Sequence, residues 1–297
     1  MNFLLIGHSV VDKIIDGEHQ SKKPGGIFYS VISFLSQIDL QDKLFLCSNI
    51  NKENAKLFKE AFDLVEKDFI QTVKSIPCVE LFVNKAGERE ETYSEIAQNL
   101  NLPSKRLGRF DGILINMISG YDLSLPQLKE LRKNYNGLIY FDVDTLSRGV
   151  DKNLKRVFKP IKDFNEWAQC IDIMQANESE LKTLSSYLDE KLIIEELFSY
   201  GIQQIIITRS ERGATVIIKE NNSLKQFHKD ALQVKTINKV GCGDVFGAVY
   251  FYNYIKNKNI LLALEQANLF AGAATTYSTV KDFLNLKKDV YKRISKK

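Results

Sequence analysis

The sequence TINKVGCGDVFGAVY (residues 236–250) places two glycines, a cysteine and an aspartate just before a long apolar run. The run VFGAVYFYNYI (245–255) has apolar or aromatic side chains at helical spacing, which predicts a helix. Gly241-Cys242-Gly243-Asp244 should then form its N-terminal end, where the first backbone N–H groups lack helical partners and the dipole is positive. Such an end can bind an anion, and glycine lets a ligand approach the backbone. The same four residues also fit a simple glycine turn in which Asp244 caps the helix.

Length and composition indicate one large globular domain over residues 1–297. The chain is 44% hydrophobic and 26% charged, and its net charge of +4 makes no case for nucleic-acid binding. No apolar run approaches the ~20 residues of a membrane helix, so no membrane partner is expected. The start MNFLLIGHSVV lacks a basic n-region and is interpreted as a first strand, not a signal peptide. The four cysteines are far apart without a CxxC pair, which favours a reducing, cytoplasmic location.

Short apolar strands alternate with amphipathic helices along the chain. Strands are predicted at 2–7, 43–50, 111–117, 137–144, 170–177 and 203–210, and helices at 26–38, 53–62 and 125–135. This alternation predicts an α/β fold, a doubly wound, mainly parallel sheet with helices on both faces.

Two stretches differ from this pattern and predict a small added sheet, or β lid, with strands over approximately 12–22 and 73–94. KIIDGEHQ (13–20) has hairpin character, and KAGE (85–88) is a predicted turn between alternating strands. Apolar side chains at Val79, Leu81 and Val83 are expected on exposed strands, and an uncovered sheet edge invites pairing. A homodimer through the lid is therefore a possible assembly.

Ligands of doubly wound sheets bind beyond the carboxyl ends of the strands. The residues that follow predicted strands are therefore the candidates for a site. They are Asp12, Gly25, Gly26, Asp142, Asn177, Thr208 and Asp244.

Several motifs carry a family resemblance, although neither a GxxxxGK[ST] loop nor a GxGxxG after a strand is present. GCGDVFGA is similar to the GAGD signature of the ribokinase (PfkB) family of sugar and nucleoside kinases. Further elements in the family's order resemble its N-x-x-E motif, its T-x-G-x-x-G nucleotide loop, its N-terminal acceptor-binding elements and its D-P-N-x-R stretch. These elements are NESE (177–180), TRSERG (208–213), GHSVVD (7–12) with PGG (24–26), and DVDTLSR (142–148).

The resemblance implies an ATP-dependent, Mg²⁺-requiring kinase that phosphorylates a hydroxyl of a small polyol, namely a sugar, a nucleoside or a cyclitol. Phosphoryl transfer needs an in-line acceptor oxygen, charge stabilisation and a base for the departing proton. Asp244 would be the base. The N–H groups of Gly241, Cys242 and Gly243 would stabilise the transferring phosphoryl oxygens.

The remaining site residues have both a functional and a structural interpretation. The resemblance assigns Asn177, Thr208 and Gly213 to the nucleotide, and Glu180 to Mg²⁺ through bound water. It assigns the acceptor to Asp12, Gly25, Gly26 and Ser30. In the structural interpretation, NESE is an ordinary acidic helix start and Asp12 is a turn-capping carboxylate. The two glycines would then only make room for the following helix, and Asp142 with Arg148 would form an ion pair.

Four positions depart from the family pattern. Ser30 replaces an asparagine that contacts the sugar, and Ser210 replaces a glycine of the nucleotide loop, so the backbone there is expected to differ. Asn238 replaces an aspartate, and Cys242 stands where alanine is common and is expected to be a small apolar residue, not a nucleophile. These changes keep open the alternative of a noncatalytic small-molecule-binding protein on the same fold.

Overall fold

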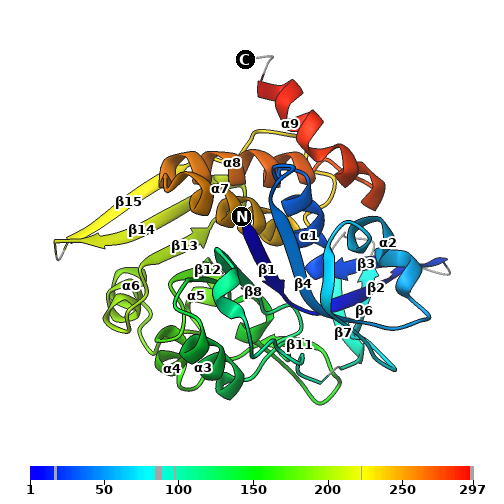
Figure 1. The fold of residues 1–297 in the computed structure, drawn as a ribbon, viewed down its shortest axis with the longest axis horizontal. Helices are drawn as coiled ribbons and strands as arrows, with labels where there is room; N and C mark the ends of the chain where they lie inside the picture. The colour runs from blue at the N-terminus through cyan, green and yellow to red at the C-terminus, as the bar shows by residue number, and fades with distance from the viewer. Residues whose placement is uncertain (17–18, 84–88, 97, 222, 295–297) are drawn as a thin grey trace.

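The computed structural model describes residues 1–16, 19–83, 89–96, 98–221 and 223–294 (Figure 1). Its main element is a nine-stranded sheet in the order β15-β14-β13-β12-β9-β8-β1-β4-β5. Seven strands are parallel: β1 (Asn2–Ile6), β4 (Lys43–Ile50), β5 (Glu66–Thr72), β8 (Gly112–Asn116), β9 (Leu138–Asp142), β12 (Ile173–Asn177) and β13 (Gln204–Thr208). The predicted α/β fold with a mainly parallel sheet is confirmed.

Two antiparallel strands extend one end of this sheet. β14 (Ala214–Glu220) pairs with β13, and β15 (Ser223–Lys229) pairs with β14. Figure 1 shows this hairpin projecting from the body as a long arm.

Alternate residues of the strands face two separate cores, one on each side of the sheet. Phe3 and Leu5 of β1 belong to one core, whereas Leu4 and Ile6 belong to the other. The helices that contribute to the first core are α1 (Ile27–Leu35), α2 (Ala55–Phe62), α7 (Cys242–Asn257), α8 (Ile260–Ala274) and α9 (Leu286–Ile294). The second core receives α3 (Leu125–Asn134), α4 (Phe164–Ala168), α5 (Glu178–Leu181) and α6 (Glu190–Ser199), on the opposite side of the sheet in Figure 1.

A four-stranded sheet, here called the lid sheet, stands beside the carboxyl end of the main sheet. Its order is β3-β2-β6-β7, formed by β2 (Ser9–Asp16), β3 (His19–Gly26), β6 (Cys78–Val83) and β7 (Arg89–Glu95). The pairs β2–β3 and β6–β7 are antiparallel, and β2–β6 is parallel. The predicted KAGE turn lies outside the described residues.

The expectation of exposed apolar side chains on the lid strands is wrong for two of the three residues. Val79 and Leu81 are buried, at 2% and 6% exposure, because β6 is an interior strand and both side chains pack into the core that contains Phe3 and Leu5. The side chain of Val83 lies outside the described set.

Short elements complete the chain around the site. The hairpin β10 (Arg148–Val150) and β11 (Arg156–Phe158) joins β7 through a bridge between Thr92 and Lys155. Four 3₁₀ turns, η1 (Leu107–Arg109), η2 (Asp144–Ser147), η3 (Ser210–Arg212) and η4 (Val280–Asn285), connect larger elements.

Within the described ranges, none of the helices has the length and apolar character needed to cross a bilayer.

Candidate active site

A cavity of about 550 Å³ lies where the carboxyl ends of the parallel strands meet the lid sheet and the start of α7. Most of the predicted site residues line it. They are Asp12, Gly26, Asn177, Glu180, Thr208, Gly213, Gly241, Cys242, Gly243 and Asp244. Gly25 and Ser30 are absent from the lining.

The helix predicted after the glycine-rich residues 241–243 is present, and its N-terminal end lines the cavity. The helix begins at Cys242, and Gly241 precedes it with φ 77°. A Cβ at Gly241 would lie 2.4 Å from the Tyr29 ring, so both conformation and space require glycine. Among the described residues, no protein acceptor takes the N–H of Gly241 or Gly243, whereas the N–H of Cys242 makes a long bond (3.4 Å) to the Lys239 carbonyl. The two glycine N–H groups are therefore the available donors.

Asp244 lies in the first turn of α7 and lines the cavity. Its Oδ1 accepts a hydrogen bond of 2.5 Å from the Asn116 side chain. Burial and the nearby Asp144 carboxylate raise the pKa of Asp244 well above its usual value, and the bond from Asn116 opposes that rise. A partly desolvated carboxylate with a raised pKa is suited to accept a proton.

The ends of three neighbouring strands place a row of polar side chains beneath Asp244. Asn116, Asp142 and Gln175 are in register on β8, β9 and β12. Gln175 donates to Asp142 (2.7 Å) and to the Gly243 carbonyl (3.2 Å), and it accepts from the Tyr140 hydroxyl. The row therefore fixes the first turn of α7 relative to the sheet.

Asn177 and Glu180 form a reciprocal cap at the start of α5. Asn177 Oδ1 accepts from the N–H groups of Ser179 and Glu180, and the Glu180 carboxylate accepts from the Asn177 N–H and side chain. The structural interpretation of NESE thus holds, while both residues also line the cavity.

Carboxylates concentrate in this part of the cavity. Burial and Asp144 raise the pKa of Glu180 to about 7, and burial with the charges of Asp144 and Glu180 raises the pKa of Asp142 well above its usual range. This surplus of oxygen ligands and negative charge suits a hard divalent cation such as Mg²⁺. In the described part of the chain, however, no three acidic, histidine or cysteine side chains group closely enough to hold a metal directly. The residues therefore fit Mg²⁺ that is bound mainly by phosphate and water.

The sequence leaves open whether Asp142 and Arg148 form a structural ion pair or act as ligands. Arg148 lies 3.8 Å from Glu180 Oε1 and over the Phe158 ring. Both Arg148 and Asp142 line the cavity.

Asp12 faces the cavity from β2 and is 9% exposed. Gly25 on β3 lies against this side chain, since a Cβ at Gly25 would be 2.4 Å from Asp12 Oδ2. Gly26 has φ 63° and is the N-cap residue of α1. Ser30 is fully buried and accepts a hydrogen bond of 3.2 Å from Asn116. Gly25 and Ser30 thus support the cavity wall from behind.

The loop after β13 forms the other end of the cavity. Thr208 ends β13, and Gly213 has φ 87°, with no room for a Cβ, which would lie 2.0 Å from the Lys229 carbonyl. Ser210 has φ 52°, the left-handed region that favours glycine. Ser210 therefore has a backbone conformation that glycine adopts more readily than serine.

Cys242 shows the properties of a small apolar residue. Burial and the nearby Asp244 carboxylate raise the pKa of its thiol to about 12, so the thiol stays protonated. A protonated thiol is a poor nucleophile.

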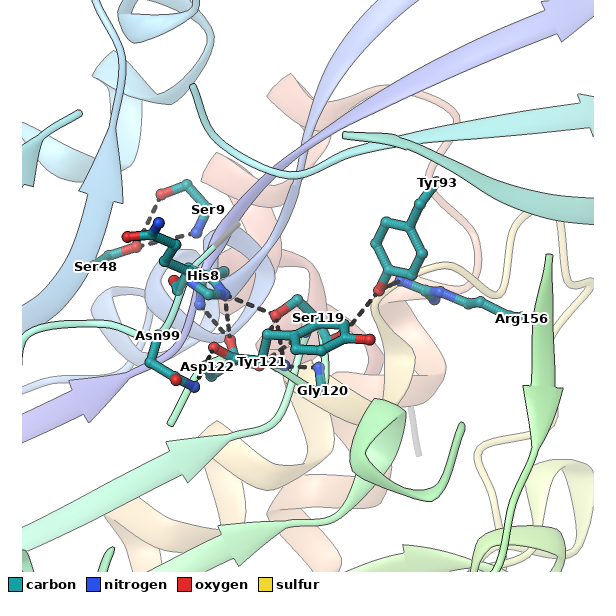
Figure 2. A network of polar contacts seen from close by, with 11 residues as sticks. His8, Ser9, Ser48, Tyr93, Asn99, Ser119, Gly120, Tyr121, Asp122 and Arg156 are labelled. Atoms are coloured by element: carbon teal, nitrogen blue, oxygen red, sulfur yellow. Dashed lines mark hydrogen bonds and ion pairs between the residues drawn. The ribbon is translucent and has the colours of Figure 1, made fainter. Parts of the chain in front are cut away.

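A buried polar network, shown in Figure 2, joins the base of the lid sheet to the loop after β8. Asp122 accepts from the His8 N–H (2.7 Å) and from the Ser119 N–H (2.8 Å), and His8 Nδ1 lies 2.7 Å from Ser119 Oγ. Burial raises the pKa of Asp122, but the His8 charge and these hydrogen bonds outweigh it and lower the pKa overall.

The same network reaches the lid and the cavity. The Tyr93 hydroxyl on β7 donates to the Ser119 carbonyl (3.2 Å) and accepts from Arg156 (2.7 Å), whose guanidinium also lies over the Tyr93 ring. Arg156 lines the cavity. The network therefore holds β2, β7 and β11 in fixed relation around the site.

Three site residues, Asn116, Gln175 and Arg156, were missed by the sequence interpretation. Asn116 and Gln175 lie at or near the ends of predicted strands, so the rule that selected Asn177 and Thr208 could have found them. Arg156 lies in a short hairpin without a strong pattern, and no sequence signal marks it.

Comparisons with known proteins find a family match over part of the chain. Residues 144–285 match the model of the pfkB family carbohydrate kinase. No curated protein matches the sequence.

Several solved structures share the fold over nearly the whole chain. The ribokinase of Arabidopsis thaliana, complexed with ribose and ATP, has TM-score 0.76 and 16% identity, covering 98% of this chain and 97% of its own. Ribokinase from Thermotoga maritima has TM-score 0.75 and 15% identity, with 98% and 99% covered. A pyrophosphate-dependent kinase of the ribokinase family, complexed with a pyrophosphate analogue and myo-inositol, has TM-score 0.70 and 15% identity, with 92% and 94% covered.

The enzyme class predicted from the sequence, a phosphotransferase with an alcohol acceptor, is that of the matched family. The predicted resemblance is therefore confirmed: residues 144–285 match the pfkB family of carbohydrate kinases, and the whole chain has the ribokinase fold.

Proposed function

We propose that the protein is an ATP-dependent kinase that phosphorylates a hydroxyl of a small polyol, which is a sugar, a nucleoside or a cyclitol. One observation carries the proposal. A single cavity connects Asp12 on the lid side with Thr208 and Gly213 at the far end, and Asp244 lies with the start of α7 along its lining.

Asp244 acts as the general base in this proposal. Its carboxylate accepts the proton of the acceptor hydroxyl as that oxygen attacks the terminal phosphorus of ATP, the bond from this phosphorus to the bridging oxygen breaks, and ADP leaves. The N–H groups of Gly241 and Gly243, with the positive end of the α7 dipole, stabilise charge on the transferring group. The N–H of Cys242 contributes less, because it is already bonded to Lys239.

Mg²⁺, when bound, would neutralise phosphate charge. Glu180 would hold it through water, and Asn177 would keep the Glu180 carboxylate in place through the cap described above.

The far end of the cavity favours a nucleotide as the phosphoryl donor. The segment 231–236 and α8 also line the cavity, with the apolar Ala231, Leu232 and Ala271 beside the polar Gln233 and Asn268. Apolar surface with a few polar groups suits a planar base, which pyrophosphate lacks.

The acceptor end combines one carboxylate with an apolar wall. Asp12 can accept hydrogen bonds from two neighbouring hydroxyls. Val79, Leu81 and Ile118 lie on the same cavity surface and can contact the C–H face of a ring. This arrangement supports a polyol acceptor without distinguishing the three classes.

The experiment is a panel of D-ribose, D-fructose, adenosine and myo-inositol, each assayed with ATP and with pyrophosphate at saturating Mg²⁺. We expect ATP-dependent turnover of at least one acceptor. Turnover with pyrophosphate but not with ATP would contradict ATP as the phosphoryl donor. Binding of an acceptor without any turnover would favour the noncatalytic alternative.

We further propose a cytoplasmic protein, because all four cysteines, Cys47, Cys78, Cys170 and Cys242, are free thiols, as a reducing compartment requires.

A further inference from the structure

Asn116 occupies an unusual position between Ser30 and Asp244. It is the last residue of β8, is 1% exposed, and is not part of the cavity lining. Its Nδ2 donates one hydrogen bond to Asp244 Oδ1 (2.5 Å) and one to Ser30 Oγ (3.2 Å). Both amide protons are therefore used.

The amide oxygen of Asn116 has no such partner. Asn116 Oδ1 is buried, and among the described residues nothing donates to it. An unsatisfied buried carbonyl lowers the stability of the fold. If the amide were reversed, Oδ1 instead of Nδ2 would face the Asp244 carboxylate. The observed orientation therefore gives Asp244 a hydrogen-bond donor and leaves Oδ1 without one.

Ser30 provides the second contact that orients the Asn116 amide. Its hydroxyl is fully buried on α1 and accepts the second Asn116 proton, which fixes the amide plane. The three residues come from α1, β8 and α7, and the chain separations of the two contacts are 86 and 128 residues.

We propose that Asn116 is a positioning residue for the base: oriented by Ser30, it holds one carboxylate oxygen of Asp244 and so directs the carboxylate toward the acceptor. This inference rests on the proposed function, because it assumes that Asp244 is the base.

The charges around Asp244 show what the hydrogen bond from Asn116 contributes. The carboxylates that raise the pKa of Asp244 or respond to its charge are Asp12 on β2, Asp142 on β9 and Asp144 on η2. The Asn116 bond lowers the pKa of Asp244 against burial and these charges. It therefore helps to keep the base ionised as well as oriented.

The test uses Asn116→Leu, which keeps the side-chain volume and removes the donor, and the milder Ser30→Ala. The matched control is Gln204→Leu. Gln204 is also a buried amide on the main sheet, 5% exposed, and it bonds to α7 through the Tyr250 hydroxyl, far along the helix from Asp244. All variants are checked for folding by urea unfolding and for ATP binding.

With ATP and the best acceptor of the panel, we expect Asn116→Leu to lower kcat about ten- to a hundredfold while the KM for ATP changes little. The acidic limb of the kcat/KM profile should move to higher pH. Ser30→Ala should lower kcat less, and it should have no further effect in the Asn116→Leu background. Gln204→Leu should lose stability but retain kcat and the pH profile.

A second measurement does not depend on turnover. In protein labelled with ¹³C at the aspartate carboxyl carbons, the Asp244 resonance is identified by its loss in Asp244→Asn. Asn116→Leu should move its titration to higher pH, and Gln204→Leu should not. An unchanged titration, or a folded Asn116→Leu enzyme with normal kcat, would overturn the proposal. An Asp244→Asn enzyme with normal turnover would instead overturn the assignment of the base.

Discussion

The contact between Gly25 and Asp12 allows a test of the acceptor site without removing its carboxylate. In Gly25→Ala the new Cβ would lie 2.4 Å from Asp12 Oδ2 and 2.6 Å from Oδ1 and Cγ. Since separations below 3.0 Å essentially never occur, the carboxylate must move by roughly 0.6 Å or more. Gly25 does not have a positive φ, so the backbone itself accepts alanine.

If Asp12 binds acceptor hydroxyls, moving its carboxylate should weaken acceptor binding much as removing the carboxylate does. Losing a charged hydrogen-bonding partner costs about 1.5–3 kcal/mol, which is about ten- to a hundredfold in KM. We expect Gly25→Ala and Asp12→Ala both to raise the acceptor KM by this factor, while the KM for ATP barely moves. Steady-state kinetics with each substrate varied separately measures both constants.

Two further variants show whether the effect passes through the carboxylate. Gly108→Ala is the control, because a Cβ there meets nothing within 4 Å, and it should behave as the wild type. Gly25→Ala should add little in the Asp12→Ala background. An unchanged acceptor KM in both single variants would refute the role of Asp12, and it would leave that residue as a turn-capping carboxylate.

Three other predictions concern the departures from the family pattern and the assembly. Ser210→Gly should raise the free energy of unfolding by about 1 kcal/mol, because Ser210 has φ 52°; a loss of stability in urea unfolding would contradict this. Turnover should change little between potassium, sodium and a bulky organic cation at one ionic strength. The reason is that Asn238, whose Oδ1 accepts from the Val240 N–H, lacks the negative charge of an aspartate. Attraction between such a charge and a monovalent cation is about 4 kcal/mol at ~4 Å and an effective dielectric of 20. A severalfold gain in turnover that is specific to potassium would contradict this prediction. The protein should form a homodimer through the lid sheet, which has β3 as an edge strand, and a monomeric mass in light scattering at micromolar concentration would exclude it.

The parts of the fold that the sequence predicted well are those controlled by local pattern. The strand at 2–7 and the helix start within residues 241–244 follow from apolar periodicity and from glycine at the turn, and the structure has them at Asn2–Ile6 and Cys242. The lid sheet was also predicted, but the side on which Val79 and Leu81 lie was not. Their burial depends on pairing of β6 with β2 and β7, which alternation along one strand does not reveal.

The site was less predictable where contacts join distant parts of the chain. The role of Asn116 depends on Ser30 and Asp244, which only the packing of α1 and α7 against the sheet brings together. Ser210 illustrates a different limit, because surrounding structure holds a non-glycine residue in a conformation that propensity disfavours.

The central claim, that Asp244 is the base of an ATP-dependent phosphoryl transfer, is tested most directly by one comparison. The initial rate of transfer from ATP to the best acceptor is measured in the wild type and in Asp244→Asn, with folding and ATP binding determined on the same samples. Loss of a general base lowers rates by about 10²–10⁴-fold. We expect a loss of this size in Asp244→Asn with folding and ATP binding largely intact, whereas near-normal transfer by the folded variant would contradict the claim.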